Sequence, residues 1–439
     1  MKSTLLICMP ALSVLAALAM PVRLDAQNQP ATAEQNAVQP RYNVKDLGAL
    51  GTGDNGGGFG INNAGWVAGA SNLTPGGPLH AFVWYGGGPL IDIGTLGGAA
   101  CPNCNSGASV PNAMGQVEIG SDTAVLDPLG QDFGGDGTHH QNLGAIWRNG
   151  TLTALPTLAG GHNANAFGLN NHGQIIGFSE NGKHDASCAM GTPFQVTRYE
   201  AVIWEQNGEI KELPPLKERG DSVAFGFGIN DSGEAVGSSG LCSNTGLPPI
   251  YVQGPHAVLW EADGTAIDIL GNQGGIINVA NSINNRGQVV GGSVLADGTG
   301  LTWVWSRQTG KQDLPTLPGA FFAVAPCCNT INDRGEVAGF SIDASGSRAV
   351  VWLNQNIYDL NDLVPADSPL YLLSGDSINE AGEIAGQGCV LPDCTVLHAF
   401  VATPTNGQDF SSLSRGVRRP IAIPENVRNL LRRPSRISR

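Results

Sequence analysis

Residues 282–291 read SINNRGQVVG, residues 303–305 read WVW and residues 313–317 read DLPTL. Apolar runs alternate here with a tight Asn/Gly turn and with short polar loops, which is typical of short strands joined by hairpins. The same plan recurs along most of the 439 residues. The chain is therefore a repeat protein, and the repeat determines the predicted fold.

The turn that begins each repeat is its most regular feature. An asparagine is followed three residues later by a glycine, and a second glycine comes four residues after the first, or five in the second copy. The asparagine side chain closes a short hairpin, and glycine adopts the left-handed backbone that a Cβ would oppose. The seven pairs are Asn62/Gly65, Asn112/Gly115, Asn170/Gly173, Asn230/Gly233, Asn284/Gly287, Asn332/Gly335 and Asn379/Gly382. Each copy is thus predicted to begin with two tightly joined strands.

A third strand follows as a continuous apolar run, which is typical of a strand buried on both faces. In six of the seven copies this run ends in tryptophan. These side chains are predicted to lie in the core: Trp84, Trp147, Trp204, Trp260, Trp305 and Trp352. A short fourth strand completes each copy except the last.

The seventh copy has no fourth strand after Val401, whereas residues 46–48 form a spare one near the N-terminus. Four strands per copy, at a period of about 50 residues, predict an all-β fold. We expect a seven-bladed β-propeller with four-stranded blades over residues 41–404. The N-terminal strand, near Asp46, would close the ring by pairing with the last blade, near Phe400. A β-solenoid is the alternative, although its turns usually need only about 20–30 residues.

Two further motifs suggest a family. The triplet His-Ala-Phe stands at residues 80–82 and 398–400, and residues 46–51 read DLGALG. With the Asn-x-x-Gly turns, these motifs resemble the secreted HAF-repeat family of bacteria over residues 41–404. The resemblance implies an extracellular repeat protein and carries over no catalytic motif.

Composition separates the two ends from the body of the chain. Residues 1–26 have the basic start, apolar run and small-residue end of a signal peptide, with an uncleaved membrane anchor as the alternative. Residues 27–40 are expected to form a flexible leader, and residues 405–439, with eight Arg against two acidic residues, a basic, disordered tail. Residues 27–404 carry 13 Lys/Arg against 34 Asp/Glu, which argues against a nucleic-acid partner. No later segment is apolar enough for a transmembrane helix. We expect a monomer that is secreted, extracellular or periplasmic.

Cysteine usage fits export, because eight cysteines follow residue 26, an even number. In a propeller, the loops between strands 2 and 3 share one face with the segments that lead into strand 1. All eight are predicted on this face: Cys101, Cys104, Cys188, Cys242, Cys327, Cys328, Cys389 and Cys394. The favoured disulfides are Cys188–Cys242 and Cys389–Cys394. Cys101 with Cys104, and Cys327 with Cys328, are each able to close locally, although an adjacent cysteine pair more often stays reduced or pairs elsewhere. A four-thiolate zinc site from the last two pairs is the alternative.

The longest loops lie on the same face, at residues 121–142, 179–198 and 238–255. Long loops on a rigid scaffold commonly bind ligands, although drift tolerated by a stable ring explains them equally well. The candidate binding residues in these loops are Asp132, Asp136, His139, His140 and His184. The aspartates would suit Ca²⁺ and the adjacent histidines a transition metal. A solvated loop that binds no cofactor is the simpler interpretation.

Motifs of catalysis are missing from the sequence, which has no Gly-x-Ser-x-Gly elbow, no His-Glu-x-x-His and no phosphate-binding loop. We therefore expect a secreted, non-enzymatic binding or scaffold protein that acts through the loop-rich, cysteine-bearing face. Its extracellular ligand would be a glycan or a protein. The alternative is a secreted hydrolase or lyase acting on glycans, with carboxylates at the central channel.

Overall fold

The computed structural model describes residues 41–133, 137–185, 197–242, 246–247, 250–251 and 254–405. The predicted signal peptide and leader, and the predicted tail beyond residue 405, lie outside this part of the chain. Single 3-10 turns occur at Gly98–Ala100, Lys217–Arg219 and Leu360–Asp362. None of these turns has the length or the apolar character needed to cross a membrane.

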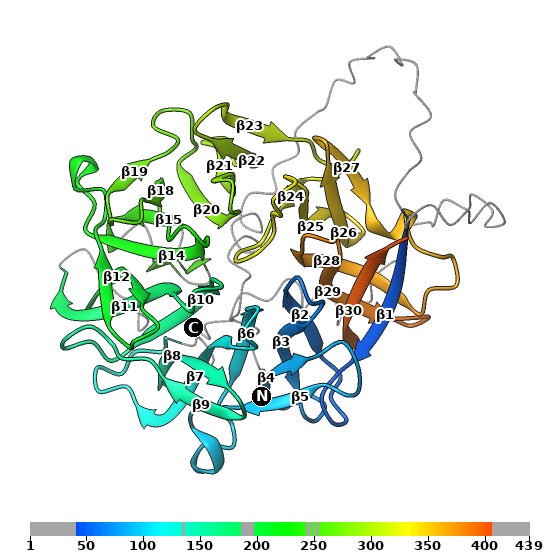
Figure 1. The fold of residues 1–439 in the computed structure, drawn as a ribbon, viewed down its shortest axis with the longest axis horizontal. Helices are drawn as coiled ribbons and strands as arrows, with labels where there is room; N and C mark the ends of the chain where they lie inside the picture. The colour runs from blue at the N-terminus through cyan, green and yellow to red at the C-terminus, as the bar shows by residue number, and fades with distance from the viewer. Residues whose placement is uncertain are drawn as a thin grey trace.

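Seven four-stranded antiparallel sheets are arranged in a ring, as predicted for a seven-bladed β-propeller (Figure 1). Blade 1 contains β2 (Gly56–Ile61), β3 (Val67–Asn72), β4 (Leu79–Trp84) and β5 (Ile91–Gly94). Blade 2 contains β6 (Ser106–Pro111), β7 (Val117–Leu126), β8 (His140–Arg148) and β9 (Thr151–Ala154). Blade 3 contains β10 (Ala164–Leu169), β11 (Ile175–His184), β12 (Thr197–Trp204) and β13 (Ile210–Leu213).

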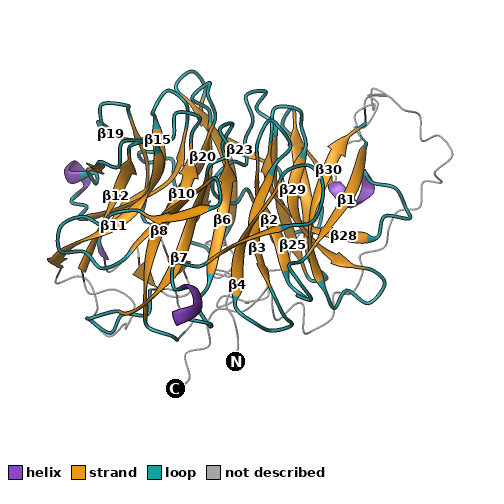
Figure 2. Cartoon of the chain, turned by 60° about the horizontal axis from the view of Figure 1, so that its bottom comes forward, coloured by secondary structure: helices purple, strands orange, loops and turns teal. Residues whose placement is uncertain are grey.

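The remaining blades repeat this order. Blade 4 contains β14 (Val223–Ile229), β15 (Ala235–Gly240), β18 (His256–Trp260) and β19 (Ala266–Asp268). A small hairpin of β16 (Gly246–Leu247) and β17 (Ile250–Tyr251) is inserted between its second and third strands. Blade 5 contains β20 (Ile277–Ile283), β21 (Val289–Val294), β22 (Gly300–Ser306) and β23 (Gly310–Leu314). Blade 6 contains β24 (Phe322–Val324), β25 (Val337–Asp343), β26 (Gly346–Leu353) and β27 (Asn356–Asp359). Figure 2 shows the turns of all blades gathered at the two ends of the ring.

Blade 7 combines strands from both ends of the described chain. It contains β28 (Leu370–Ile378), β29 (Ile384–Val390), β30 (Leu397–Pro404) and, as its fourth strand, β1 (Tyr42–Gly48). The blue β1 lies beside the orange-red β30 in Figure 1, and Asp46 is opposite Phe400 in the register. His398 contacts Asp46 at 2.9 Å, just as His80 contacts Asp92 at 3.0 Å in blade 1. β1 is thus chemically equivalent to the fourth strand of another blade.

Most of the core lies between the blades, and one further cluster joins buried side chains of blades 2 to 6. Seven separate clusters of buried apolar side chains occupy the seven interfaces between neighbouring blades. Along β18, Val258 and Trp260 pack toward blade 3, whereas Leu259, between them, packs toward blade 5. The third strands are continuously apolar because both of their faces are buried in this way.

Three of the tryptophans also link neighbouring blades by hydrogen bonds. Each donates its Nε1–H to the carbonyl of a proline that follows the fourth strand of the preceding blade, at 2.7–2.8 Å. The pairs are Trp204 with Pro156, Trp260 with Pro214 and Trp352 with Pro315. The Leu-Pro endings in the sequence therefore supply an acceptor to the next blade.

Blade 5 differs from the predicted arrangement of tryptophans. Trp305 has the predicted register position, opposite Val289, but its side chain is only half-buried, whereas Trp303 is fully buried. Trp303 donates its Nε1–H to Ser293 and covers Gly291. Trp305 packs at the margin of the same core cluster, so a strand ending in Trp-Val-Trp places one indole fully in the core and the other at its edge.

The innermost strands carry an irregularity that was not predicted. In blades 1, 3, 4, 5 and 7, one residue bulges out of the ladder at the same place: Phe59, Phe167, Phe227, Asn281 and Asp376. The backbone carbonyl two residues before the bulge residue lies against the second glycine of the repeat. A Cβ at Gly291, for example, would stand 2.2 Å from the carbonyl oxygen of Val279. Glycine is required there because the bulge brings two backbones together.

Candidate functional site

The face that carries the seven Asn turns, the hairpin face, is held together by a closed ring of hydrogen bonds. The side-chain amide of each turn asparagine donates to the backbone carbonyl of the turn asparagine in the next blade, at 2.8–3.2 Å. The order is Asn62, Asn112, Asn170, Asn230, Asn284, Asn332, Asn379 and back to Asn62. The last bond joins positions 317 residues apart in the sequence.

Within each blade the same asparagine closes its own turn, as predicted. Its Oδ1 accepts the backbone N–H groups two and four residues ahead, and the glycine three residues ahead has φ between +70° and +79°. In blades 3 to 7 the side-chain amide also donates to a Gln or Glu four residues ahead, for example from Asn284 to Gln288 at 2.8 Å. This Gln/Glu partner was not recognised in the sequence, although its fixed spacing could have revealed it.

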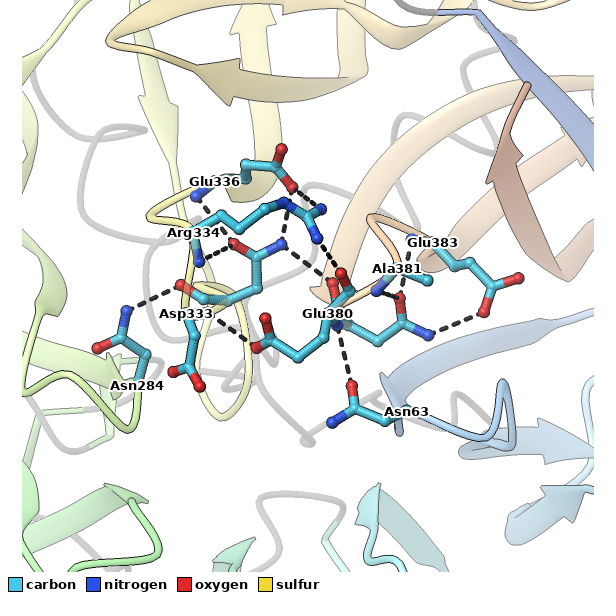
Figure 3. Close-up of polar contacts among 10 residues, drawn as sticks. Asn63, Asn284, Asp333, Arg334, Glu336, Glu380, Ala381 and Glu383 are labelled. Carbon is cyan, nitrogen blue, oxygen red and sulfur yellow. Dashed lines mark hydrogen bonds and ion pairs between the residues drawn. The ribbon is translucent and has the colours of Figure 1, made fainter. Parts of the chain in front are cut away.

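A second series of bonds follows the ring at the next residue of each turn. Figure 3 shows the backbone N–H of Asp333 donating to Glu380, and that of Glu380 donating to Asn63. Six such bonds occur, and the series is interrupted only where Ala113 has no side-chain acceptor. The polar groups of the hairpin face are thus used mainly to hold blades together.

The opposite face, the loop face, carries the loops between second and third strands and the segments leading into first strands. Cys101 is bonded to Cys104 just before β6, and Cys389 to Cys394 in the β29–β30 loop. Cys242 is also disulfide-bonded, and its predicted partner, Cys188, lies outside the described residues. These positions agree with the predicted face.

Cys327 and Cys328 contradict that prediction. They are bonded to each other, but they lie between β24 and the bridge at Ile331, where the innermost strand of blade 6 is interrupted, and not in the segment before β24. Residues 326–329 replace the single bulge residue of the other blades, and pairing resumes at Ile331, opposite Val337. Pro326 has no N–H to continue the ladder, so the strand is interrupted there. The four-thiolate zinc site that was the alternative to these disulfides is not formed, because Cys327 and Cys328 are not grouped with Cys101 and Cys104.

The candidate binding residues are dispersed. Asp132 is buried and accepts the backbone N–H of Gly137 at 3.1 Å, while His184 is exposed at the end of β11. The two adjacent histidines point to different partners: His139 contacts the carbonyl of Gly130, whereas His140 contacts that of Thr123 and lies beside Cys101. A transition-metal site that uses both histidines stays a prediction. Asp136 lies outside the described residues, so a calcium site with Asp132 stays a prediction.

The loop that follows β7 is anchored by a buried polar network. Asp127 accepts the N–H groups of Leu129 and Gln131 at 2.8 and 2.9 Å, and the side-chain amide of Asn163 at 2.7 Å. Gln131 in turn donates to Glu180 of blade 3 at 2.7 Å. Because all four polar side chains are buried, this part of the loop has one preferred position rather than the solvated conformation that the sequence suggested.

Exposed apolar side chains gather on the loop face. Among the described residues, eight large apolar side chains are exposed, and six of them lie on this face. They are Val125, Leu126 and Leu129 in blade 2, Leu241 in blade 4, Ile276 before β20 and Phe321 before β24. The other two, Ile91 and Met114, lie in the hairpins of the opposite face.

Three buried carboxyl groups have perturbed acidity. Burial raises the pKa of Asp376, at the bulge of β28, to about 7, and that of Glu118 well above its usual range. Glu118 accepts the N–H of Val110 at 3.0 Å, and so stabilises the enlarged bulge of β6. Burial, with repulsion from Glu212, raises the pKa of Glu200 to about 8. Raised pKa values of this kind accompany both buried structural carboxyls and catalytic acids.

No family model and no curated protein matches the chain. Among solved structures it is similar to the β-propeller domain of the Trilobed protease from Pyrococcus furiosus, with 9% identity, a TM-score of 0.43, and coverage of 85% of this chain and 98% of that one. It is also similar to the Pyrococcus horikoshii acylaminoacyl peptidase (10% identity, TM-score 0.44, coverage 83% and 53%) and to an Aleuria aurantia lectin (6% identity, TM-score 0.33, coverage 83% and 95%). Similarities this low carry no argument about the site.

Proposed function

We propose that the protein is an exported, non-enzymatic binding protein that engages its ligand through the loop face. The observation that carries the proposal is the unequal distribution of exposed apolar side chains, six on the loop face against two on the hairpin face. An excess of exposed apolar side chains favours the loop face as the interaction surface, because their burial against a partner is favourable. The hairpin face, by contrast, uses its polar groups for contacts between blades.

The ligand is a protein rather than a glycan. Five of the six exposed side chains are aliphatic, and Phe321 is the single aromatic one. A sugar ring is bound well by flat aromatic side chains, whereas aliphatic side chains suit the apolar centre of a protein–protein contact. The anchored loop after β7, which carries Leu129 next to the network of Asp127, would lose little conformational freedom on binding.

Export is part of the proposal. The signal-peptide pattern of residues 1–26, the eight cysteines that follow it and the resemblance to HAF-repeat proteins support it. Export predicts that the chain recovered from outside the cytoplasm begins at or close to Gln27, which mass spectrometry of that chain measures.

The rival function is a glycan hydrolase, and one observation favours it. Asp376 lies on an innermost strand, and burial places its pKa at about 7, which suits a general acid. Glycoside hydrolysis usually needs two carboxyl groups about 5–10 Å apart, so Asp376 would require a second carboxylate across the ring axis.

The proposal is tested with two pairs of variants that place a charge on one face each. Leu126→Glu with Phe321→Glu alters the loop face, and Ile91→Glu with Met114→Glu alters the hairpin face to a similar extent. Both are compared with the unchanged chain on a panel of purified secreted and cell-surface proteins and on a glycan array, by surface plasmon resonance. We expect the loop-face pair alone to abolish binding to a protein of the panel.

Binding that survives the loop-face pair but fails in the hairpin-face pair would refute the proposed face. Cleavage of an arrayed glycan that Asp376→Asn abolishes would establish the rival function instead. Both variant pairs are first checked for an unchanged melting temperature, because the charges are introduced at exposed positions where substitutions usually change stability by less than about 0.5 kcal/mol.

A further inference from the structure

A cysteine pair and a histidine meet on blade 2, at the edge of the loop face. Cys101 and Cys104 precede β6, and His140 is the first residue of β8. The Sγ of Cys101 is 3.8 Å from Nε2 of His140, and the potential ligand atoms of the three side chains lie within 4.8 Å of one another. Among the described residues, no other group of three or more His, Cys, Asp or Glu side chains is arranged in this way.

The imidazole is oriented by a backbone contact. Nδ1 of His140 is 2.7 Å from the carbonyl oxygen of Thr123, and because a carbonyl only accepts, Nδ1 carries the proton. The lone pair is therefore on Nε2. A carbonyl contact at the other ring nitrogen is the usual way in which proteins fix the tautomer of a metal-binding histidine.

The backbone is shaped to bring the two sulfurs together. Gly97 lies under the pair, and a Cβ at that position would stand 2.6 Å from the Sγ of Cys104 and 2.6 Å from the Cβ of Cys101. The backbone N–H of Gly97 donates to the carbonyl of Asp122 at 3.0 Å, which ties this segment to β7. The positions of both cysteines are thus set by the sheet, not by the disulfide alone.

We propose that Cys101, Cys104 and His140 form a redox-gated Zn²⁺ site, open when the disulfide is reduced and closed when it is oxidised. An external dithiol reduces the bond between Cys101 and Cys104 by supplying two electrons and two protons. The two cysteines become thiols, and the external dithiol becomes a disulfide. Zn²⁺ then binds both sulfurs and Nε2, and the two thiol protons are released. Two cysteines and one histidine leave the fourth tetrahedral position for water, the ligand set of open zinc sites.

The distances suit this ion. Zn–S bonds of about 2.3 Å and Zn–N bonds of about 2.0–2.1 Å separate tetrahedral ligand atoms by roughly 3.5–3.8 Å. Sγ of Cys101 has nearly this separation from Nε2 of His140, at 3.8 Å, but it is also 3.9 Å from Nδ1, so the sulfur has to move toward the Nε2 side of the ring before both atoms bind one ion. Two sulfurs released from a disulfide need to move apart by rotation about their own side chains, and the short Cys-x-x-Cys segment allows this without a change in the sheet. Both cysteines are buried while His140 is partly exposed, so the ion would enter from the histidine side.

The test uses the full chain, reduced with dithiothreitol and freed of it without oxygen. Zn²⁺ affinity is measured by competition with a chromophoric chelator, and Co²⁺ is used as a spectroscopic stand-in because tetrahedral thiolate coordination gives intense absorption bands. The matched variants are His140→Ala and His139→Ala, since His139 is the neighbouring residue and contacts Gly130 instead. A double variant, Cys101→Ser with Cys104→Ser, controls for thiols released from the other disulfides.

We expect the reduced chain to bind one Zn²⁺ at this site and the oxidised chain to bind none there. His140→Ala should weaken binding by at least about 100-fold, because loss of even an outer partner of a ligand costs 10- to 100-fold. His139→Ala should leave the affinity unchanged. His140→Gln, which still donates to Thr123 but has no imidazole, replaces the alanine variant if that variant does not fold. Equal affinity of the reduced chain and the double cysteine variant would overturn the site and leave a disulfide that only staples the loop.

Discussion

The contribution of the asparagine ring on the hairpin face to stability can be tested by changing one side-chain amide. In Asn284→Asp the side chain keeps its shape and its acceptor oxygen, but it loses the amide that donates to Gln288 and to the carbonyl of Asn332, both at 2.8 Å. Asn284 is only 5% exposed, so water does not replace the lost partners. The change keeps the turn bonds that Oδ1 accepts from Arg286 and Gln288, and it removes the two bonds that the amide donates, one to Gln288 in the same turn and one to Asn332 in the next blade.

The expected cost follows from these contacts. Two hydrogen bonds contribute about 1 kcal/mol each, and a buried acceptor left without a donor costs roughly 1–3 kcal/mol more. Asn284→Asp should therefore lower the free energy of unfolding by about 3–5 kcal/mol at neutral pH. Asn285→Asp is the matched control, because Asn285 is exposed and uses its side chain mainly as an acceptor, from Asp231. Its cost should stay within about 0.5 kcal/mol.

The assay is denaturant unfolding of both variants between pH 4 and pH 8. The introduced carboxyl group faces acceptors in a buried site, which raises its pKa in the folded state above that in the unfolded state. Its penalty is then complete above the folded pKa and disappears as the pH falls toward the unfolded pKa of about 4. We expect the two variants to differ most at pH 8 and least at pH 4. Equal stability of Asn284→Asp and Asn285→Asp at pH 7 would refute the structural role of the ring.

Three further outcomes follow from the packing of the blades and from the buried carboxyl groups. Trp352→Ala removes a fully buried indole and its bond to the preceding blade, so it should lower the free energy of unfolding by about 3–5 kcal/mol. Trp305→Ala, at a half-buried position, should lower it clearly less, and thermal melting measures both. Gly291→Ala should be strongly destabilising, since its Cβ would stand 2.2 Å from a carbonyl oxygen, whereas Gly292→Ala, whose Cβ would have ordinary contacts of 3.6 Å or more, should melt like the unchanged chain. The pKa of Glu200, about 8 when folded, exceeds its unfolded value of about 4.3, so ionisation disfavours the fold and stability should fall as the pH rises between these values. Glu200→Gln should flatten this decline in melting temperature between pH 5 and pH 8, and an unchanged slope would contradict the assignment.

Much of the architecture could be read from residues that act locally. Asn284 and Gly287 determine a turn through bonds that span two to four residues, so the hairpins were predictable. The spare strand at Asp46 was recognisable because it repeats the motif that other blades place after their third strand. Its contact with His398 has the same geometry as that of His80 with Asp92.

The errors have a common origin. Cys327 and Cys328 were placed in a loop because their blade was assumed to follow the regular pattern, whereas an insertion in the innermost strand displaces them. Periodicity identifies Trp305 as the end of its strand, but it does not show that the ring of Trp303 fills the space beside Gly291 and is the more deeply buried of the two. Neither feature changes the strand count, so the repeat pattern contains no sign of it.

The repeat by itself determined the number of blades, the chemistry of the turns and the way the ends of the ring meet, because these depend on bonds within one copy and on counting copies. Only the tertiary structure decided that Asn379 reaches Asn62, that His140 lies beside Cys101 and that six of the eight exposed large apolar side chains share one face. These contacts join residues 39 to 317 positions apart, or different blades altogether, and they exist because ring closure brings equivalent positions within bonding distance.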